Sequence, residues 1–334
     1  MRVSERGRAV LLAAALVLFA GLAGLGFLWW SIRPAAAPGS PPVEMVVEPG
    51  TSARSLGQQL ARQGVIRSPL LFELWLRARG DAGRIQAGTY RLPRDRSLPA
   101  VIRMLVEGET LLVEVTVPEG LRLEQVAGVV ARALGVDSTA FVAAGTDSLL
   151  ADSLGIPSST LEGYLFPETY RVDPSTTARQ MARIMASQFW IVFDDAWQAR
   201  AESLGFTVDR IVTLASIVEE EARVPEERKT IAGVYWNRLD KGMRLEADPT
   251  VQYALGGHRE RVLYRDLEVD SPYNTYRNLG LPPGPIASPG RAALEATLYP
   301  DSVPYLYFVA TGSGGRHAFS KTLAEHERKR RALR

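Results

Sequence analysis

The sequence lacks cysteine entirely and contains few histidines. No cysteine occurs among the 334 residues, so disulfide bonds, thiolate zinc sites and thiol nucleophiles are excluded. The three histidines, His258, His317 and His326, do not have the spacing of a histidine-based metal motif such as HExxH. We therefore expect no metal site and no cofactor.

The chain also lacks a strong excess of charge of either sign. Its formal net charge is +2 at pH 7, which gives no electrostatic basis for binding nucleic acid. Hydrophobic residues make up 46% of the sequence, which is enough to form packed cores. The length allows two or three domains. The composition therefore favours a multidomain protein without a nucleic-acid partner.

One long run near the N-terminus contains no charge. The run Ala9–Trp30 has the length needed to cross a bilayer, for which about 20 apolar residues suffice. Arg2, Arg6 and Arg8 precede it, whereas only Arg33 follows closely. By the positive-inside rule, residues 1–8 are cytoplasmic and the rest of the chain is extracytoplasmic or periplasmic. We predict a single-pass anchor, residues 9–30, in the inner (cytoplasmic) membrane.

A cleaved signal peptide is the competing interpretation of this run. Ala35–Ala37 offers an A-x-A cleavage pattern. A signal peptide, however, has an apolar region of only about 7–15 residues, so the length favours an uncleaved anchor. Residues 31–42 then form a linker, and the Pro-rich part from Arg33 to Pro42 is typical of a short extended spacer.

A small module is expected over residues 43–109. Short alternating segments that end at turn residues predict strands, and apolar residues at helical spacing predict helices. Ser52 is a candidate N-cap, and the helix that follows Ser68 is expected to bury Leu71, Leu74 and Trp75. Such a module could bind glycan or pack on a neighbour. The expected elements are strands at Val43–Val47 and Ala87–Leu92 and helices at Ser52–Gln63, Ser68–Arg79 and Leu98–Leu105.

The stretch Ile211–Tyr253 organises the rest of the chain. Leu214, Ile217 and Val218 lie on one helical face, and Glu221 continues that face at i+7. A carboxyl group on a buried face is costly to ionise, so its pKa should rise. A raised carboxyl pKa is what a general acid needs near neutral pH.

The alternative is a buried structural ion pair, because such pairs also perturb pKa values. In that case Glu221 would pair with an arginine, for which Arg238 and Arg244 are the candidates. Glu219 and Glu220 lie off the apolar face and are expected to meet water or partners on its flanks.

Other segments predict further elements of a larger domain, residues 110–325. The loop Leu161–Tyr170 combines three aromatic residues with two carboxylates and could line a sugar cleft or form a core loop with surface acids. One long helix is expected over Thr177–Glu202, another from Pro225 to Leu239, and a strand at Tyr305–Val309. Residues 326–334 are expected to be a basic, solvated tail.

Several motifs, taken in order, resemble those of the endolytic murein transglycosylases of the YceG-like family, and the resemblance covers nearly the whole chain. Besides the N-terminal run, the motifs are Ala87–Tyr90, Glu162–Gly163 with Phe166–Thr169, Ala215–Glu219 with Glu221, Asn237–Leu239, Met243–Leu245, Asp248–Val251, Tyr273–Tyr276, Gly280–Gly284 and Pro304–Val309.

The resemblance implies an α+β fold: a membrane anchor, a small LysM-like α/β module at 43–109 and a larger α+β catalytic domain. In this family the second Glu of an E-x-E motif is the catalytic acid, which corresponds to Glu221. The middle residue of that motif is often basic, but here it is Glu220, which adds negative charge. The implied substrate-binding residues are Glu168, Glu219, Asp248, Tyr273, Asn274, Thr275 and Tyr276, and no metal is implied.

The implied reaction cleaves the MurNAc–GlcNAc bond of nascent peptidoglycan strands without water. Glu221 protonates the leaving oxygen and then takes the proton of the sugar's own C6 hydroxyl, which leaves a 1,6-anhydro-MurNAc end and terminates glycan elongation. The implied partners are peptidoglycan glycan strands, the inner membrane and peptidoglycan synthases, that is, penicillin-binding proteins.

Three alternatives remain open from the sequence. Tyr273, Asn274 and Asp248 could shape loops instead of holding sugar. The protein could be a catalytically inactive glycan-binding scaffold. It could also be a two-carboxylate glycoside hydrolase that uses Glu221 with a second acid such as Glu168.

Overall fold

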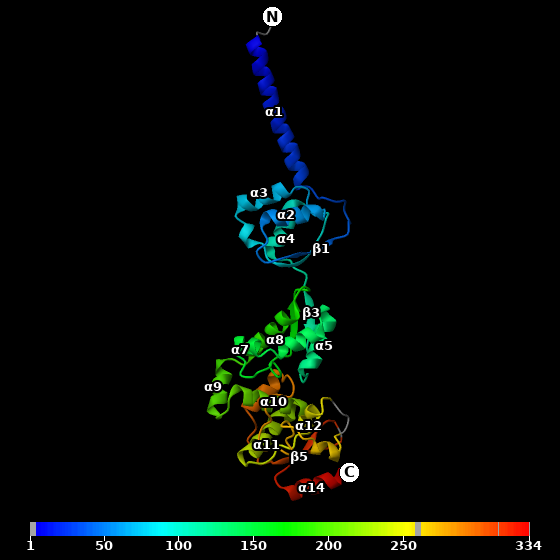
Figure 1. Ribbon diagram of the computed structural model, residues 1–334, viewed down its shortest axis with the longest axis vertical. Helices are drawn as coiled ribbons and strands as arrows, with labels where there is room; N and C mark the ends of the chain where they lie inside the picture. Colours follow the sequence, from blue (N-terminus) through cyan, green and yellow to red (C-terminus); the bar gives the residue numbers. More distant parts are fainter. Residues whose placement is uncertain (1–4, 258–261, 313, 334) are drawn as a thin grey trace. The chain divides into compact units, whose positions relative to one another are not determined.

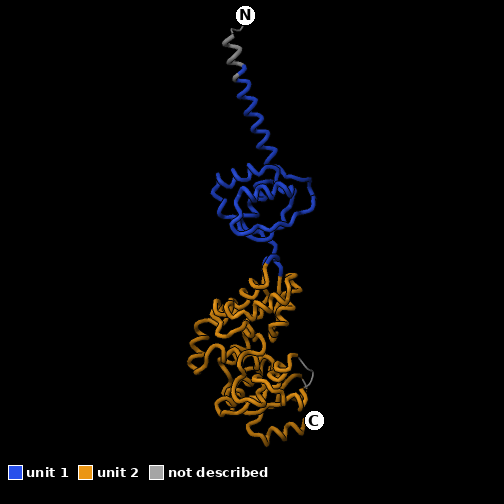
Figure 2. Tube along the Cα trace, viewed as in Figure 1, with its two compact units in different colours: residues 1–113, 172–175 blue, residues 114–171, 176–334 orange. Residues whose placement is uncertain are grey.

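A computed structural model describes residues 5–257, 262–312 and 314–333 (Figure 1). Arg2 and His258, which the sequence analysis used, lie outside these residues. Contacts divide the chain into two compact units, residues 1–113 with 172–175 and residues 114–171 with 176–334 (Figure 2). Each unit mixes helices with short strands, so the predicted α+β class is confirmed. The predicted boundaries of the anchor, linker, module, larger domain and tail stay predictions.

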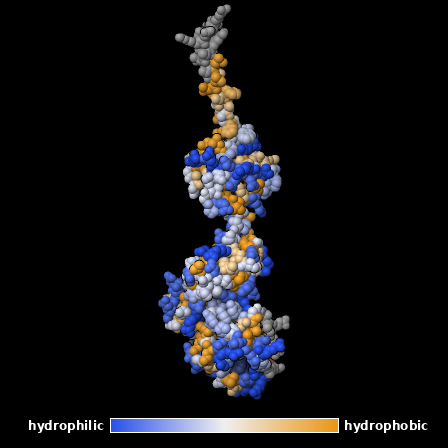
Figure 3. Space-filling view, viewed as in Figure 1, coloured by the Kyte–Doolittle hydropathy of each residue, from blue (hydrophilic) through white to orange (hydrophobic). Residues whose placement is uncertain are grey.

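The first unit begins with a long apolar helix, α1 (Glu5–Ile32). Its part Ala14–Ile32 is long and apolar enough to cross a membrane, and only 6% of that window is buried. Figure 3 shows the apolar colour along this helix. Large side chains such as Phe19 are exposed to 72%. A helix that is apolar on all sides and exposed over nearly all of its length is typical of a membrane span.

The segment after α1, predicted as a short extended spacer, is hydrogen-bonded to the folded module. The backbone N–H of Ala36 donates to the carbonyl oxygen of Arg94 at 3.0 Å. The N–H of Gly39 donates to Oδ2 of Asp95 at 3.1 Å. Nε of Arg67 donates to the carbonyl of Pro34 at 2.8 Å. The Pro-rich composition predicts an extended chain but cannot predict that its backbone groups find partners on the module.

The module itself has one two-stranded sheet and three α-helices around a single core. The strands pair antiparallel from Val43 opposite Leu92 to Val47 opposite Gly88. The serine side chains at positions 52 and 68 accept hydrogen bonds from the first turns of the helices they precede, which confirms the Ser52 cap. The elements are β1 (Val43–Val47), α2 (Ala53–Arg62), α3 (Pro69–Arg79), β2 (Gly88–Leu92) and α4 (Leu98–Glu107), with a 3₁₀ turn η1 (Ala82–Arg84) before β2.

The predicted buried face of α3 is confirmed in part, because Leu71 and Trp75 pack against the core as partly buried residues, and it is wrong for Leu74. Phe72 and Leu76 are the buried residues, whereas Leu74 is 50% exposed. The helix has apolar residues on two sides, so its spacing alone allows more than one inward face. The side chains of Phe72 and Leu76 join the core with Leu56 and Tyr90.

The second unit starts with helices around the small sheet β3–β4. The single helix expected over 177–202 is wrong, because the chain breaks at Phe193. Asp194 follows with extended backbone, and its side chain accepts a hydrogen bond from the N–H of Trp197 at 3.0 Å, which starts a new helix. The elements are β3 (Val113–Thr116), α5 (Leu123–Leu134), α6 (Ser138–Gly145), α7 (Ser148–Ser153), β4 (Thr169–Val172), α8 (Ala178–Val192) and α9 (Asp195–Ser203).

A buried helix, α10 (Val208–Glu221), lies at the centre of the second unit. Every residue from Ile211 to Val218 is buried, and the helix contacts α11, α12 and α13. The helix expected from Pro225 instead begins as a 3₁₀ turn before α11. These elements are η2 (Pro225–Glu227), α11 (Arg228–Asp240), α12 (Asp248–Ala254), η3 (Tyr264–Glu268) and α13 (Arg291–Leu298).

The C-terminal part forms an antiparallel hairpin with a helix packed on it. Strand β5 (Tyr307–Ala310) pairs with β6 (His317–Ser320), with Tyr307 opposite Ser320. The expected strand at 305–309 therefore begins two residues later. Most of residues 326–334 lie in helix α14 (Leu323–Ala332), which contacts both strands. The basic end is thus folded against the hairpin.

Candidate active site

Glu221 is the last residue of the buried helix α10. Ala222 follows with extended backbone and takes the chain away from the helix axis. The predicted apolar face is confirmed, because Leu214, Ile217 and Val218 are all fully buried, whereas Glu221 at the end of that face is partly buried. The core therefore fixes the helix, and its end presents the Glu221 carboxyl group to a cavity.

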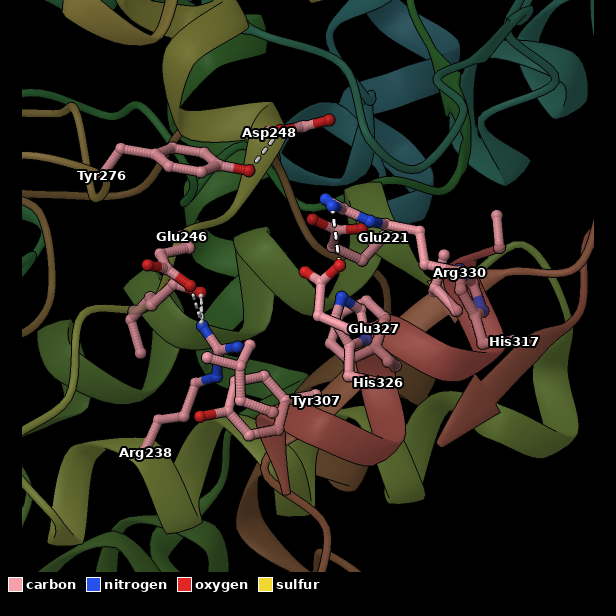
Figure 4. Close-up of a pocket in the computed structure, with 15 residues that line it drawn as sticks. Glu221, Arg238, Glu246, Asp248, Tyr276, Tyr307, His317, His326, Glu327 and Arg330 are labelled. Carbon is pink, nitrogen blue, oxygen red and sulfur yellow. Dashed lines mark hydrogen bonds and ion pairs between the residues drawn. The ribbon is translucent and has the colours of Figure 1, made fainter. Parts of the chain in front are cut away.

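That cavity has a volume of about 500 Å³ and is formed by elements from distant parts of the second unit (Figure 4). Besides Glu221 it is lined by residues of α11, the loop before α12, Tyr276, both hairpin strands and α14. Its lining is rich in ionisable groups. The charged and aromatic lining residues are Glu221, Arg238, Glu246, Asp248, Tyr276, Tyr307, Phe308, His317, His326, Glu327 and Arg330.

Two further cavities follow in series, each sharing lining residues with the one before it. One of about 520 Å³ shares Glu221, Asp248 and His317 with it. Another of about 540 Å³ meets the second at Glu220 and is lined by Tyr253 among others. Glu221 therefore lies between two connected hollows of a longer polar groove, and such a shape suits a polymeric ligand better than a small compact one.

The pKa of the Glu221 carboxyl group is raised from 4.5 to about 7. Burial contributes most, and the negative charge of Asp248 adds to it. The Tyr235 hydroxyl donates a hydrogen bond to Oε1 at 3.2 Å, which opposes the rise by stabilising the charged form. Near neutral pH the group is thus divided between acid and carboxylate.

Glu221 does not form the structural ion pair that the sequence left open as an alternative. Arg238 instead donates to the carbonyl oxygens of Leu306 at 2.6 Å and Leu245 at 2.8 Å, and it pairs with the Glu246 carboxylate at 3.1 Å. Arg244, the other candidate, is exposed. Among the described residues no cation lies within ion-pair distance of Glu221.

Asp248 and Tyr276 are the predicted binding residues that the structure brings to Glu221. Both line its cavity, and the Tyr276 hydroxyl donates to Oδ1 of Asp248 at 2.7 Å (Figure 4). Burial and the Asp248 charge raise the pKa of Tyr276, which keeps it a donor. The pair places one fixed negative charge beside the Glu221 carboxyl group.

Asn274 and Thr275 are fully buried and bind the protein itself. Nδ2 of Asn274 donates to the carbonyl oxygens of Leu267 and Val269 at 2.9 and 2.8 Å. The Thr275 hydroxyl lies 2.9 Å from that of Thr250. These contacts favour the interpretation that the two residues shape loops around the site.

Three other predicted residues lie outside the lining of the Glu221 cavity. Tyr273 packs on Tyr253, with ring centroids 4.7 Å apart. Glu168 is exposed in the loop before β4. Glu219 is nearly buried, pairs with Arg228 at 3.3 Å and accepts a hydrogen bond from the N–H of Gly290 at 2.9 Å. Glu219 thereby ties α10 to the start of α13.

The sequence analysis missed a histidine–carboxylate pair in the groove. Nδ1 of His317 lies 2.8 Å from Oε2 of Glu227, and both side chains are nearly buried. His317 lines both cavities that meet at Glu221. The two residues are 90 positions apart, so no local pattern could have joined them.

Glu246 is a second feature that the sequence analysis missed. It is the one described non-glycine residue with positive φ, at 50°. Its carboxylate is held by Arg238 at the wall of the Glu221 cavity (Figure 4). Left-handed backbone is uncommon for a side chain of this kind, and such outliers gather at functional sites.

The chain resembles proteins of known name over most of its length. The family described as the YceG-like family matches residues 45–332. The chain is 38% identical over 302 residues to the endolytic murein transglycosylase of Bacillus subtilis, which covers 86% of this chain and 83% of that protein. It is 30% identical over 345 residues to the endolytic murein transglycosylase of Streptococcus pneumoniae, of whose length it spans 62%.

A solved structure is also similar. The crystal structure of a yceG-like protein from Listeria monocytogenes matches with a TM-score of 0.61 and 33% sequence identity. The match covers 86% of this chain and 99% of that one. The likeness therefore extends well beyond the residues around Glu221.

Proposed function

The chain belongs to the YceG-like family, and we propose that it is an endolytic murein transglycosylase in which Glu221 is both the general acid and the general base. The substrate is the glycan strand of peptidoglycan. The observation that carries the assignment is the position of Glu221, a carboxyl group with a pKa of about 7 between two connected cavities of a polar groove.

The first chemical step uses the protonated form of Glu221. The carboxyl proton goes to the oxygen that links C1 of MurNAc to GlcNAc, and the C1–O bond breaks with its electron pair on the leaving oxygen. The sugar left behind has the character of an oxocarbenium ion. A pKa near the working pH lets one group donate in this step and accept in the next.

The second step uses the carboxylate form. The C6 hydroxyl oxygen of the same sugar attacks C1 and closes a 1,6-anhydro ring, and its proton goes to Glu221, which restores the starting acid. No water enters the product. The negative charge of Asp248, held by the Tyr276 hydroxyl, favours both the protonated acid before cleavage and the positive sugar during it.

His317 is proposed to hold the substrate in the groove. Because an ionised carboxylate accepts hydrogen bonds, the Glu227 carboxylate selects the form of His317 that carries a proton on Nδ1. In the neutral ring, Nε2 is then an acceptor. An N–H of an acetamido group or a hydroxyl of the sugar is a donor of the right kind for it.

The two-carboxylate hydrolase is a second candidate because Asp248 lies beside Glu221. In that case Asp248 activates water, whereas the exposed Glu168 lines none of the three cavities of the groove. The catalytically inactive scaffold is the third candidate. Glycan binding alone does not require a carboxyl group with a pKa near 7.

Mass spectrometry of digested glycan separates the three candidates. Purified sacculi are incubated with the full chain in detergent, and the soluble products are analysed. The proposal expects products ending in 1,6-anhydro-MurNAc, which lack one water relative to ordinary reducing ends. Reducing ends would establish the hydrolase, and no release from folded protein would establish the scaffold.

The location and partners follow from the N-terminal helix and the substrate. We propose that α1 remains as a single-pass anchor in the inner membrane with the N-terminus in the cytoplasm, so that the groove meets newly made strands. The bonding of Ala36 to the module supports this over cleavage at Ala35–Ala37. Protease access in sealed vesicles tests the topology, and co-purification tests the predicted penicillin-binding protein partner.

The module in the first unit is proposed to be LysM-like and to bind glycan. Its order β1-α2-α3-β2 has the two strands paired across two helices, which supports the proposal. Deleting residues 43–109 while keeping the anchor should then weaken action on sacculi more than action on short soluble strands. Equal loss on both substrates by a folded protein would place the module in the catalytic groove instead.

A further inference from the structure

The module in the first unit exposes two leucines on one side of α3. Leu70 is 58% and Leu74 is 50% exposed. Because they are four residues apart on a helix, they lie on the same face. The buried face of the helix is occupied by Phe72 and Leu76, so the two leucines form an additional apolar surface that the module does not cover.

The start of α3 is held at the end of the apolar helix α1. The guanidinium of Arg67 lies 5.0 Å from the ring centroid of Trp30. Arg67 also donates to the carbonyl of Pro34 at 2.8 Å. Ser68, the next residue, is the N-cap of α3. Figure 1 draws α3 at the end of the module that carries α1 and β1 at the far end.

If α1 spans the bilayer, the depth of Trp30 in the membrane determines the depth of α3. Tryptophans at the ends of membrane spans lie among the lipid headgroups. Arg33 stacks on Trp29 at 3.5 Å, which places a second guanidinium at the same level. The first turn of α3 therefore belongs to the interface and not to the water beyond it. An exposed apolar helix face at that depth inserts about 5–10 Å into the boundary between headgroups and acyl chains.

The charges beside the leucines fit an anionic lipid surface. Arg54 is 78% and Arg77 is 70% exposed, and both pair with the single carboxylate of Glu73. Two guanidinium groups on one carboxylate leave an excess of positive charge beside Leu70 and Leu74. Basic residues near the headgroups are attracted by anionic lipids.

We propose that α3 is a second membrane contact, in which Leu70 and Leu74 insert into the anionic headgroup region next to the point where α1 leaves the bilayer. The inference rests on the proposed membrane anchor and is independent of the proposed chemistry at Glu221. Its consequence is that one face of the module lies against lipid and is closed to glycan, so that a bound strand has to use another face.

The absence of cysteine makes a direct test possible. Leu74→Cys and Leu70→Cys each give the full chain one thiol, which is labelled with an environment-sensitive fluorophore. Val46→Cys is the matched control, because Val46 is also exposed, to 41%, but lies on β1. Leu22→Cys, in the apolar part of α1, reports on the anchor itself.

Each labelled protein is placed in nanodiscs of phosphatidylcholine and phosphatidylglycerol, with or without a spin-labelled quencher lipid. The proposal expects the quencher lipid to reduce emission at positions 70 and 74 by about twofold or more, because an inserted face lies at the depth of the quencher. The quencher lipid should not reduce the emission of the label at position 46, whereas iodide dissolved in the water should reduce it. Thermal melting checks that each labelled variant is folded.

Three results would overturn the proposal. Labels at 70 and 74 that behave like the label at 46 would place α3 in water. Labels shielded from both quenchers would mean that protein covers the face, either a second copy or a partner. A label at 22 that lipid does not quench would remove the anchor and the docking together. Product analysis from soluble strands is measured separately, so failure of the chemistry is distinguishable from all three.

Discussion

The hydroxyl group of Tyr235 lies 3.2 Å from Oε1 of Glu221 and donates a hydrogen bond to it from the neighbouring helix α11. This bond favours the carboxylate, whereas burial and the Asp248 charge favour the acid. A single carboxyl group is therefore held by opposing influences near the pH at which it must act. The Asp248 charge and the Tyr235 hydrogen bond each come from one side chain and can be removed separately.

Glu221→Gln should remove the proton that the leaving oxygen requires while keeping the shape of the side chain. General acid–base catalysis contributes about 10²–10⁴-fold, and one residue supplies both steps, so the loss should reach or exceed the upper end. The measurement is the release of anhydro-muropeptides from sacculi. Near-normal release by folded Glu221→Gln protein would rule out the mechanism.

The same variant should also change how stability depends on pH. The folded pKa of Glu221, about 7, lies above the ordinary value of 4.5. Between these values the folded state binds more protons than the unfolded state, so the free energy of unfolding falls as pH rises. The free energy of unfolding of Glu221→Gln does not fall in this way, because the amide does not titrate. Its melting temperature should therefore match the wild type at low pH and exceed it above pH 7.

Asp248→Asn and Tyr235→Phe should shift the activity profile in opposite directions. Removing the Asp248 charge lowers the pKa of Glu221, so the fall in rate on the alkaline side should move to lower pH. Removing the Tyr235 hydroxyl raises that pKa, so the fall should move to higher pH. The measurement is kcat/KM against pH on soluble glycan strands. Shifts in the same direction for both variants would contradict the assignment of Glu221 as the titrating group.

Glu219→Gln should cost stability more than chemistry. The Glu219 carboxylate joins the N–H of Gly290 and the Arg228 guanidinium inside the protein. Weakening such charge-assisted bonds costs about 1–3 kcal/mol. Glu220→Gln is the matched control, because Glu220 is exposed, and it should change the melting temperature less. A loss of activity as large as that of Glu221→Gln, with unchanged melting, would make Glu219 a catalytic residue.

His317→Ala should raise KM with little effect on the pH profile. If Nε2 accepts one hydrogen bond from the substrate, its loss weakens binding roughly 2- to 10-fold. Glu227→Gln should give a smaller change in the same direction, because the amide still accepts the Nδ1 proton but no longer holds the ring with a full charge. A changed pH optimum with unchanged KM would mean that His317 acts on protons rather than on position.

Local patterns were sufficient to predict much of the fold and the key side chain. The spacing of Leu214, Ile217 and Val218 predicts both the buried helix and the position of Glu221 on its inner face. The helix start at Ser52 follows from a side chain that bonds within its own turn. In each case the interacting groups lie within two turns of one another.

The remainder of the site depends on contacts that no local pattern contains. The bond between Glu227 and His317 joins η2 to a hairpin strand, and the hydrogen bond between Tyr276 and Asp248 joins a loop to α12. Sequence motifs could list Asn274 beside Tyr276 but could not tell that Asn274 is buried and Tyr276 faces the cavity. Side-chain direction in a loop is set by the backbone around it.

The hydrogen bonds between the module and the segment after α1 determine how much a weakly binding surface of the module can contribute. A Pro-rich chain of about ten residues with no such bonds would span roughly 30 Å, and the module would spend much of its time away from the bilayer. The hydrogen bonds made by Ala36, Gly39 and Arg67 remove that freedom. Binding of the module to the membrane surface beside α1 then resembles an intramolecular step, because tethering gives the two surfaces a high effective concentration. Affinities too small to recruit a free module can therefore still decide which way the tethered one faces.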